Sequence, residues 1–182
     1  MPGKRTGEAR YRHQVTGRIN NARGHMFEEL IQNSCRLYEE EGLALIEKTP
    51  EPMRVVRSMK DNAHFTCVFE KKAQPDFKGT LRGGQAVVFE AKFTDSGRIS
   101  QSAVTDEQAR RLDAHMQLGA RCFILVSFSF ETFCAIPWAI WRDMKTLYGR
   151  KYMKCTEAEV VGRVPYTGSR IRFLEPRQEE GV

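Results

Sequence analysis

Two features that often reveal a protein's class are missing from this sequence: long apolar runs and regularly spaced cysteines. No apolar stretch approaches the roughly 20 residues that a membrane-spanning helix needs, and the first residues are charged rather than signal-like. The cysteines are odd in number, widely spaced and without a Cys-x-x-Cys pair, and they stand at Cys35, Cys67, Cys122, Cys134 and Cys155. This pattern disfavours both a disulfide framework and a structural zinc site. We therefore expect a cytoplasmic protein without a membrane partner.

Positive charge is concentrated at the start of the chain. The formal net charge of the 182 residues is +6, of which residues 1–23 carry +5. One acid, Glu8, stands there against the basic residues Lys4, Arg5, Arg10, Arg12, Arg18 and Arg23. Like charges with little to bury predict a flexible, extended arm over residues 1–23 that becomes ordered on a polyanion. Nucleic acid is the favoured polyanion, although a merely solubilising tail fits the charge equally well.

The rest of the chain reads as one domain over residues 24–175, followed by a loose tail over residues 176–182. Apolar residues recur at helical spacing from Phe27 to Tyr38, and Gly42 predicts the end of that helix. A buried strand is expected next, from Leu43 to Ile46. A β-hairpin inserted at about residues 53–73 should project from the core, because both of its faces are basic, with Arg54, Arg57, Lys60, Lys71 and Lys72.

The centre of the chain predicts a second hairpin and then a helix. Asp76 to Leu81 and Ala86 to Phe93 read as strands joined by a turn at Gly83-Gly84. Thr105 should open a helix that Gly119 ends. Ala120 to Phe128 and Phe133 to Ile136 are expected to be buried neighbouring strands.

Pro137 predicts the start of a further helix, and its stripe of Trp138, Trp141, Met144 and Tyr148 indicates core or a dimer contact. Ile171 to Leu174 is a candidate last strand. This order of elements describes an α/β fold with a mixed central sheet flanked by helices.

Charged residues interrupt an otherwise apolar strand at Glu90 and Lys92. Side chains alternate along a strand, so these two project from the same face. Pairing across the hairpin turn can bring Asp76 towards them. Two carboxylates and a lysine that converge at a strand end suit metal-assisted phosphodiester hydrolysis, because hard oxygen ligands hold Mg²⁺ or Mn²⁺. An ordinary ion pair between Glu90 and Lys92 on a solvated strand is the alternative.

Pro75-Asp76 followed by Glu90-Ala91-Lys92 resembles the signature of the PD-(D/E)XK nuclease superfamily. Further blocks occur in the order and spacing of RecU-type Holliday junction resolvases: residues 23–28, residues 48–52, Asp76-Phe77-Lys78-Gly79, Phe89-Glu90-Ala91-Lys92 and Asp106-Glu107-Gln108. The resemblance implies a PD-(D/E)XK nuclease-like core with an inserted β-hairpin stalk. The sequence departs from the family at Phe77, which is often tyrosine, and in the loop around Arg98.

The resemblance also implies an activity and a set of roles. RecU-type enzymes are homodimers that bind four-way DNA junctions and nick two strands symmetrically with Mg²⁺ or Mn²⁺, in recombination and repair. Asp76 and Glu90 would be metal ligands, with the backbone carbonyl of Ala91 as a third. Lys92 would be the catalytic lysine, and Glu28 and Gln108 would lie close to the acidic site. A recombinase or branch-migration protein is a possible further partner, and the nucleoid is the expected place of action.

Several alternatives stay open at this point. Glu28 fits a solvated position or a salt bridge equally well, and Gln108, three residues after Thr105, fits a capping box. For the whole protein, the rivals are a superfamily nuclease that acts on other DNA structures and a non-catalytic DNA-binding or recombinase-modulating protein on a nuclease scaffold. An RNA-binding module lacks exposed aromatic stacking motifs.

Overall fold

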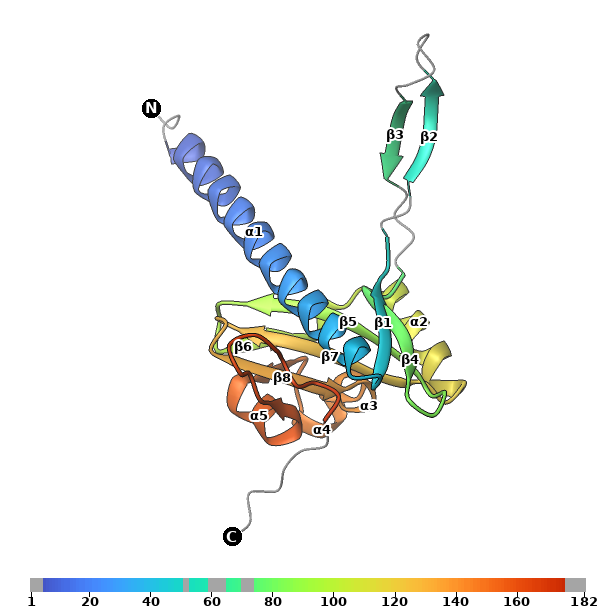
Figure 1. Cartoon of the computed structure of the whole chain (residues 1–182). Helices are drawn as coiled ribbons and strands as arrows, with labels where there is room; N and C mark the ends of the chain where they lie inside the picture. Colours follow the sequence, from blue (N-terminus) through green and yellow to red (C-terminus); the bar gives the residue numbers. More distant parts are fainter. Residues whose placement is uncertain (1–4, 51–52, 59–64, 70–73, 176–182) are drawn as a thin grey trace.

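A six-stranded mixed sheet forms the centre of the molecule (Figure 1). The computed structural model describes residues 5–50, 53–58, 65–69 and 74–175. The sheet has the order β1-β4-β5-β7-β8-β10, and only β5 and β7 run parallel. Its strands are β1 (Ala44–Lys48), β4 (Phe77–Leu81), β5 (Ala86–Thr94), β7 (Arg121–Phe128), β8 (Thr132–Pro137) and β10 (Arg163–Val164). The mixed sheet predicted from the sequence is confirmed.

Helix α1 (Arg5–Glu40) covers one face of this sheet. Its buried residues Phe27, Ile31 and Tyr38 pack with apolar side chains of β4, β5 and β7 in one core cluster. The helix ends as predicted: Gly42 has a φ of +62°, and the Leu43 N–H donates to the Tyr38 carbonyl at 2.9 Å. This left-handed cap satisfies carbonyls that the helix end would otherwise leave unpaired.

The conformation predicted for the first residues is wrong. The backbone from Arg5 to Arg23 continues α1 as a helix instead of forming an extended arm. Starting a helix is the costly step, whereas adding residues to an existing helix is nearly neutral. The packed turns from Phe27 onward supply the start, and the helix can propagate from them back to Arg5.

Four helices pack on the opposite face of the sheet. They are α2 (Asp106–Gln117), α3 (Trp138–Arg142), α4 (Met144–Tyr148) and α5 (Cys155–Gly162). Leu112, Trp141 and Met144 are fully buried there against β7 and β8. The predicted aromatic stripe therefore belongs to the core.

The single helix expected after Pro137 is in fact two short ones. Asp143, with φ −92° and ψ 16°, separates α3 from α4. Aspartate competes with the helical backbone for hydrogen bonds, which makes it a common point of interruption. The strand expected from Ile171 to Leu174 is also wrong, because this segment forms only an isolated bridge between Tyr166 and Ile171. The last strand is β10, which pairs with β8.

A two-stranded sheet of β2 (Met53–Ser58) and β3 (Phe65–Phe69) is inserted between β1 and β4. Figure 1 shows this hairpin standing away from the six-stranded sheet, as the sequence predicted. Its turn and the tail from residue 176 lie outside the described residues. A second small sheet pairs β6 (Arg98–Ser100) with β9 (Tyr152–Lys154), and a 3₁₀ turn, η1 (Gln101–Ala103), follows β6.

Within the described chain, no helix is both long and apolar enough to cross a bilayer.

Candidate active site

The β4–β5 hairpin sets the geometry of the site. Its register pairs Phe77 with Phe89, so Asp76, immediately before β4, comes level with Glu90 on β5. Gly83 and Gly84 make the turn with φ near +90°, a conformation that side chains rarely adopt. On its other side Asp76 is fixed through its carbonyl, which accepts the Thr49 N–H at 2.8 Å. The two carboxylates therefore come from neighbouring strands of one rigid sheet.

Glu90 is the unusual residue of the site. Its side chain is fully buried, at 0% exposure. Its Oε2 accepts hydrogen bonds from Lys92 Nζ, at 3.0 Å, and from Gln108 Nε2, whereas its Oε1 is buried without a hydrogen-bond partner in the described part of the chain. Burial, and then the neighbouring charge of Asp76, raises the pKa of Glu90 to about 8. A buried carboxylate with an unmet oxygen is costly unless a further group offsets it.

Asp76 and Lys92 complete the group. Asp76 Oδ2 accepts the backbone N–H of Ala91 at 2.9 Å and lies 3.7 Å from Lys92 Nζ. Lys92 Nζ is thus within ion-pair distance of both carboxylates. The structure brings together the three residues that the sequence singled out, on the face of the sheet that carries α2.

Gln108 makes both the capping-box contacts and a contact with the acidic group. With the helix N-cap Thr105 it forms a reciprocal capping box at the start of α2. Its amide nitrogen also donates to Glu90 Oε2. The cap therefore orients the glutamine towards the buried carboxylate.

Glu28 makes its contacts with Lys48 and His25. Its Oε2 forms an ion pair with Lys48 Nζ at 2.7 Å and lies 3.7 Å from His25 Nδ1. Lys48 pairs with Phe77 in the β1–β4 register, and Phe77 belongs to the core on the α1 face. Of the alternatives left open by the sequence, the salt bridge is the one that the geometry supports.

The donor set fits a hard divalent cation. Asp76 and Glu90 offer carboxylate oxygens, and the unpartnered Glu90 Oε1 is an unmet acceptor of the kind such an ion satisfies. No cluster of three or more His, Cys, Asp and Glu side chains suited to a metal occurs within the described residues. The third ligand implied by the resemblance, the backbone carbonyl of Ala91, is a neutral oxygen and does not require a further acidic side chain.

Most of the residues expected to contact DNA lie where their side chains are not described. Lys4, Lys60, Lys71 and Lys72 fall outside the described residues, and only the backbone is described at Arg5, Arg10, Arg12, Arg18, Arg54 and Arg57. Arg23 is described, and its guanidinium forms an ion pair with Asp95, just after β5. Both partners are 43% exposed, so a DNA phosphate could replace the carboxylate.

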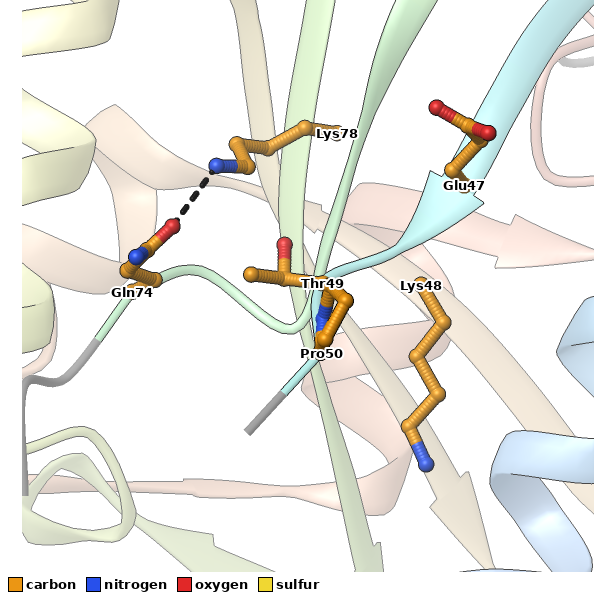
Figure 2. A pocket seen from close by; sticks show the side chains of 6 residues that line it. All are labelled: Glu47, Lys48, Thr49, Pro50, Gln74 and Lys78. Atoms are coloured by element: carbon orange, nitrogen blue, oxygen red, sulfur yellow. Dashed lines mark hydrogen bonds between the residues drawn. The ribbon is translucent and has the colours of Figure 1, made fainter. Parts of the chain in front are cut away.

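A pocket of about 390 Å³ lies at the base of the inserted hairpin (Figure 2). It is lined by Glu47, Lys48, Thr49, Pro50, Gln74 and Lys78. Figure 2 shows the Lys78 ammonium bonded to Gln74, at 2.9 Å, and the Lys48 ammonium pointing the other way. From the sequence, Lys48 and Thr49 had no role beyond their place in the block of residues 48–52. The signal that could have found them is their position directly before the inserted hairpin.

The sequence comparisons with known proteins agree on one family. The sequence model of RecU, described as recombination protein U, matches residues 22–175. A Holliday junction resolvase RecU of Streptococcus sanguinis (strain SK36) is 29% identical over 136 residues, which cover 70% of this chain and 66% of the relative. A Holliday junction resolvase RecU of Geobacillus kaustophilus (strain HTA426) is 28% identical over 146 residues, which cover 75% and 72%. This chain thus spans about two thirds to three quarters of the length of these relatives.

Among solved structures, Archaeoglobus fulgidus Hjc, a Holliday junction resolvase from an archaeal hyperthermophile, is similar with a TM-score of 0.44 at 9% identity. The match covers 70% of this chain and 90% of that one.

Proposed function

This chain belongs to the RecU family, and on that premise we propose that it is a divalent-metal-dependent endonuclease that resolves four-way DNA (Holliday) junctions by paired symmetric nicks in recombination and repair. The observation that carries the catalytic part is the fully buried Glu90, with one oxygen unmet, beside Asp76 and Lys92. A protein that only bound DNA would have no physical need for this costly arrangement.

Each residue of the group has a distinct task in this proposal. Asp76, Glu90 and the Ala91 carbonyl would hold Mg²⁺ or Mn²⁺, which when bound lowers the pKa of a water and offsets charge on the phosphate. Lys92 Nζ, within ion-pair distance of both carboxylates, offsets their negative charge and orients the attacking water. Gln108 holds Glu90 through Oε2, which leaves Oε1 free to bind.

We assign the contacts that supply DNA affinity to other parts of the chain. The basic first turns of α1 and the basic hairpin would contact phosphates, which supply affinity without reading bases. Symmetric nicking requires two sites at a fixed separation, which a homodimer provides. We place the enzyme at the nucleoid, with a recombinase or branch-migration protein as a possible further partner.

The test is cleavage of a labelled four-way junction by wild type, Asp76→Asn and Glu90→Gln. We expect wild type to nick the junction with Mg²⁺ and not with EDTA. Both variants should lose at least about 100-fold in rate while binding the junction as wild type does, because these two side chains serve the metal. Nicking that persists in either variant would contradict the assignment.

The same assay separates the rival functions. Equal cleavage of linear duplex or flapped DNA would indicate a superfamily nuclease with another substrate. Tight junction binding without metal-dependent nicking would indicate a DNA-binding protein on a nuclease scaffold.

A further inference from the structure

The small sheet of β6 and β9 presents an exposed basic face that the sequence did not single out. Its register pairs Arg98 with Lys154, Ile99 with Met153, and Ser100 with Tyr152. Ile99 and Met153 are buried in the core cluster on the α2 side of the main sheet. Because side chains alternate along a strand, Arg98, Lys154 and Tyr152 point outward.

Like charges oppose each other on this outer face. Arg98 and Lys154 are direct cross-strand partners, an arrangement that destabilises a strand pair. Lys151, just before β9, adds a third exposed cation. No ion pair within the described part of the chain involves any of these three. Glu157, the nearby carboxylate, is bonded to Arg150, so the face keeps a surplus of positive charge.

The Tyr152 ring contacts Arg98 and the neighbouring Arg150. The Arg98 guanidinium carbon lies 5.1 Å from the centre of the Tyr152 ring, and that of Arg150 lies 4.7 Å from it. Cation–π contacts of this kind restrict a long side chain without neutralising it. Arg98 is therefore restricted without being neutralised, and Lys151 and Lys154 add exposed positive charge beside it, an arrangement that favours binding of an extended polyanion.

The β6–β9 sheet also lies on the same side of the main sheet as the side chains of Glu90 and Lys92. Val88, which alternates with Glu90 and Lys92 along β5, belongs to the same core cluster as Ile99 and Met153. The β6–β9 sheet thus packs on the face of the main sheet towards which Glu90 and Lys92 project. It also follows β5 directly in the chain, four residues after Thr94.

We propose that Arg98, Lys151 and Lys154 form a DNA-backbone contact surface that holds an arm of the substrate as it leaves the active site. The inference rests on the proposed function. It adds a DNA contact on the core domain to the contacts proposed for α1 and the inserted hairpin.

Junction binding in Ca²⁺, followed by fluorescence anisotropy across a range of salt concentrations, tests this surface. Arg98→Gln, Lys151→Gln and Lys154→Gln should each weaken binding about threefold and lower the salt slope by about one, with the triple variant near three. Thermal stability should stay level or rise, because Arg98→Gln and Lys154→Gln remove a repulsion. Tyr152→Ala should weaken binding, and Tyr152→Phe, which keeps the ring, should restore it.

Arg36→Gln is the matched control, since Arg36 is an exposed arginine on α1, across the main sheet. It should leave the affinity and the salt slope unchanged. The proposal is overturned if the triple variant matches wild type in junction affinity and salt slope. It is also overturned if Arg36→Gln loses as much affinity and salt slope as the triple variant does. Failure of the proposed function has a different signature: wild type would not nick the junction in Mg²⁺, whereas the changes in salt slope would persist in Ca²⁺.

Discussion

Glu90 owes its properties to the side chains around it. Lys92 and Gln108 both donate to Oε2, and burial together with Asp76 raises its pKa. Gln108 is held in turn by Thr105, so a helix cap on the surface is connected to the deepest carboxylate of the site. Stability and activity can therefore be separated by changing the two members of the cap.

Thr105→Ala and Gln108→Ala should both lower stability and should differ in their effects on activity. Each removes one side of the capping box and should lower the free energy of unfolding by about 1 kcal/mol, and Gln108→Ala should lower it further because it also removes a donor from the buried Glu90. Only Gln108→Ala also removes the donor to Glu90, and we expect it to slow junction cleavage about tenfold while Thr105→Ala stays within about twofold of wild type. Urea unfolding and single-turnover cleavage measure the two quantities. Equal cleavage rates in the two variants would contradict a role for Gln108 beyond the cap.

At this scale the sequence predicted much of the site. Alternation along one strand placed Glu90 and Lys92 on a common face, and the glycine turn brought Asp76 level with them. The position of Glu28 could not be predicted in the same way, since helical spacing does not say which strand end the helix crosses. Its pairing with Lys48 depends on the tertiary packing of α1 on β1.

The elements differ in how far they depend on the core. Strands β2 and β3 pair only with each other among the strands that the structure describes, whereas β5 lies between β4 and β7. Local patterning was enough to predict both hairpins. It could not predict the β6–β9 sheet, because two three-residue strands more than 50 positions apart carry no periodic signal. It also missed the helical start of α1, which depends on packing further along the chain.

Replacing residues 51–73 with a short Gly/Ser linker should leave the core folded. We expect the thermal midpoint to move by no more than a few degrees, because the removed strands make their ladder only with each other. Junction affinity should fall by more than the affinity for linear duplex. Calorimetry and anisotropy measure these effects. Cooperative unfolding of the whole domain on removal of the hairpin would show instead that it is part of the core.

At the scale of the whole molecule, charge and chemistry occupy different parts of the chain. Residues 1–23 carry +5 of the net +6, whereas Asp76, Glu90 and Lys92, to which we assign the chemistry, lie in the nearly neutral remainder of the chain. Junction affinity and the rate of junction cleavage should therefore respond to mutations in different parts of the chain.

Deleting residues 1–18 removes five basic residues and one acid. The slope of log affinity against log salt should decrease in magnitude by up to about five, because each lost phosphate contact retains its counterion. Cleavage at saturating enzyme should stay within about threefold of wild type. A scrambled version of residues 1–18 is the control and should keep the wild-type slope if charge alone matters. If the truncated protein keeps the wild-type slope, residues 1–18 do not contact the DNA phosphates, which contradicts the account.

The central claim is that two carboxylates from neighbouring strands hold a divalent cation, and calorimetric titration with Mn²⁺ tests it most directly. Wild type and Thr105→Ala should bind the ion with the same affinity, and Asp76→Asn and Glu90→Gln should each weaken binding at least about tenfold, since each removes a charged ligand. Equal binding by all four proteins, or none by wild type at millimolar concentrations, would contradict the account.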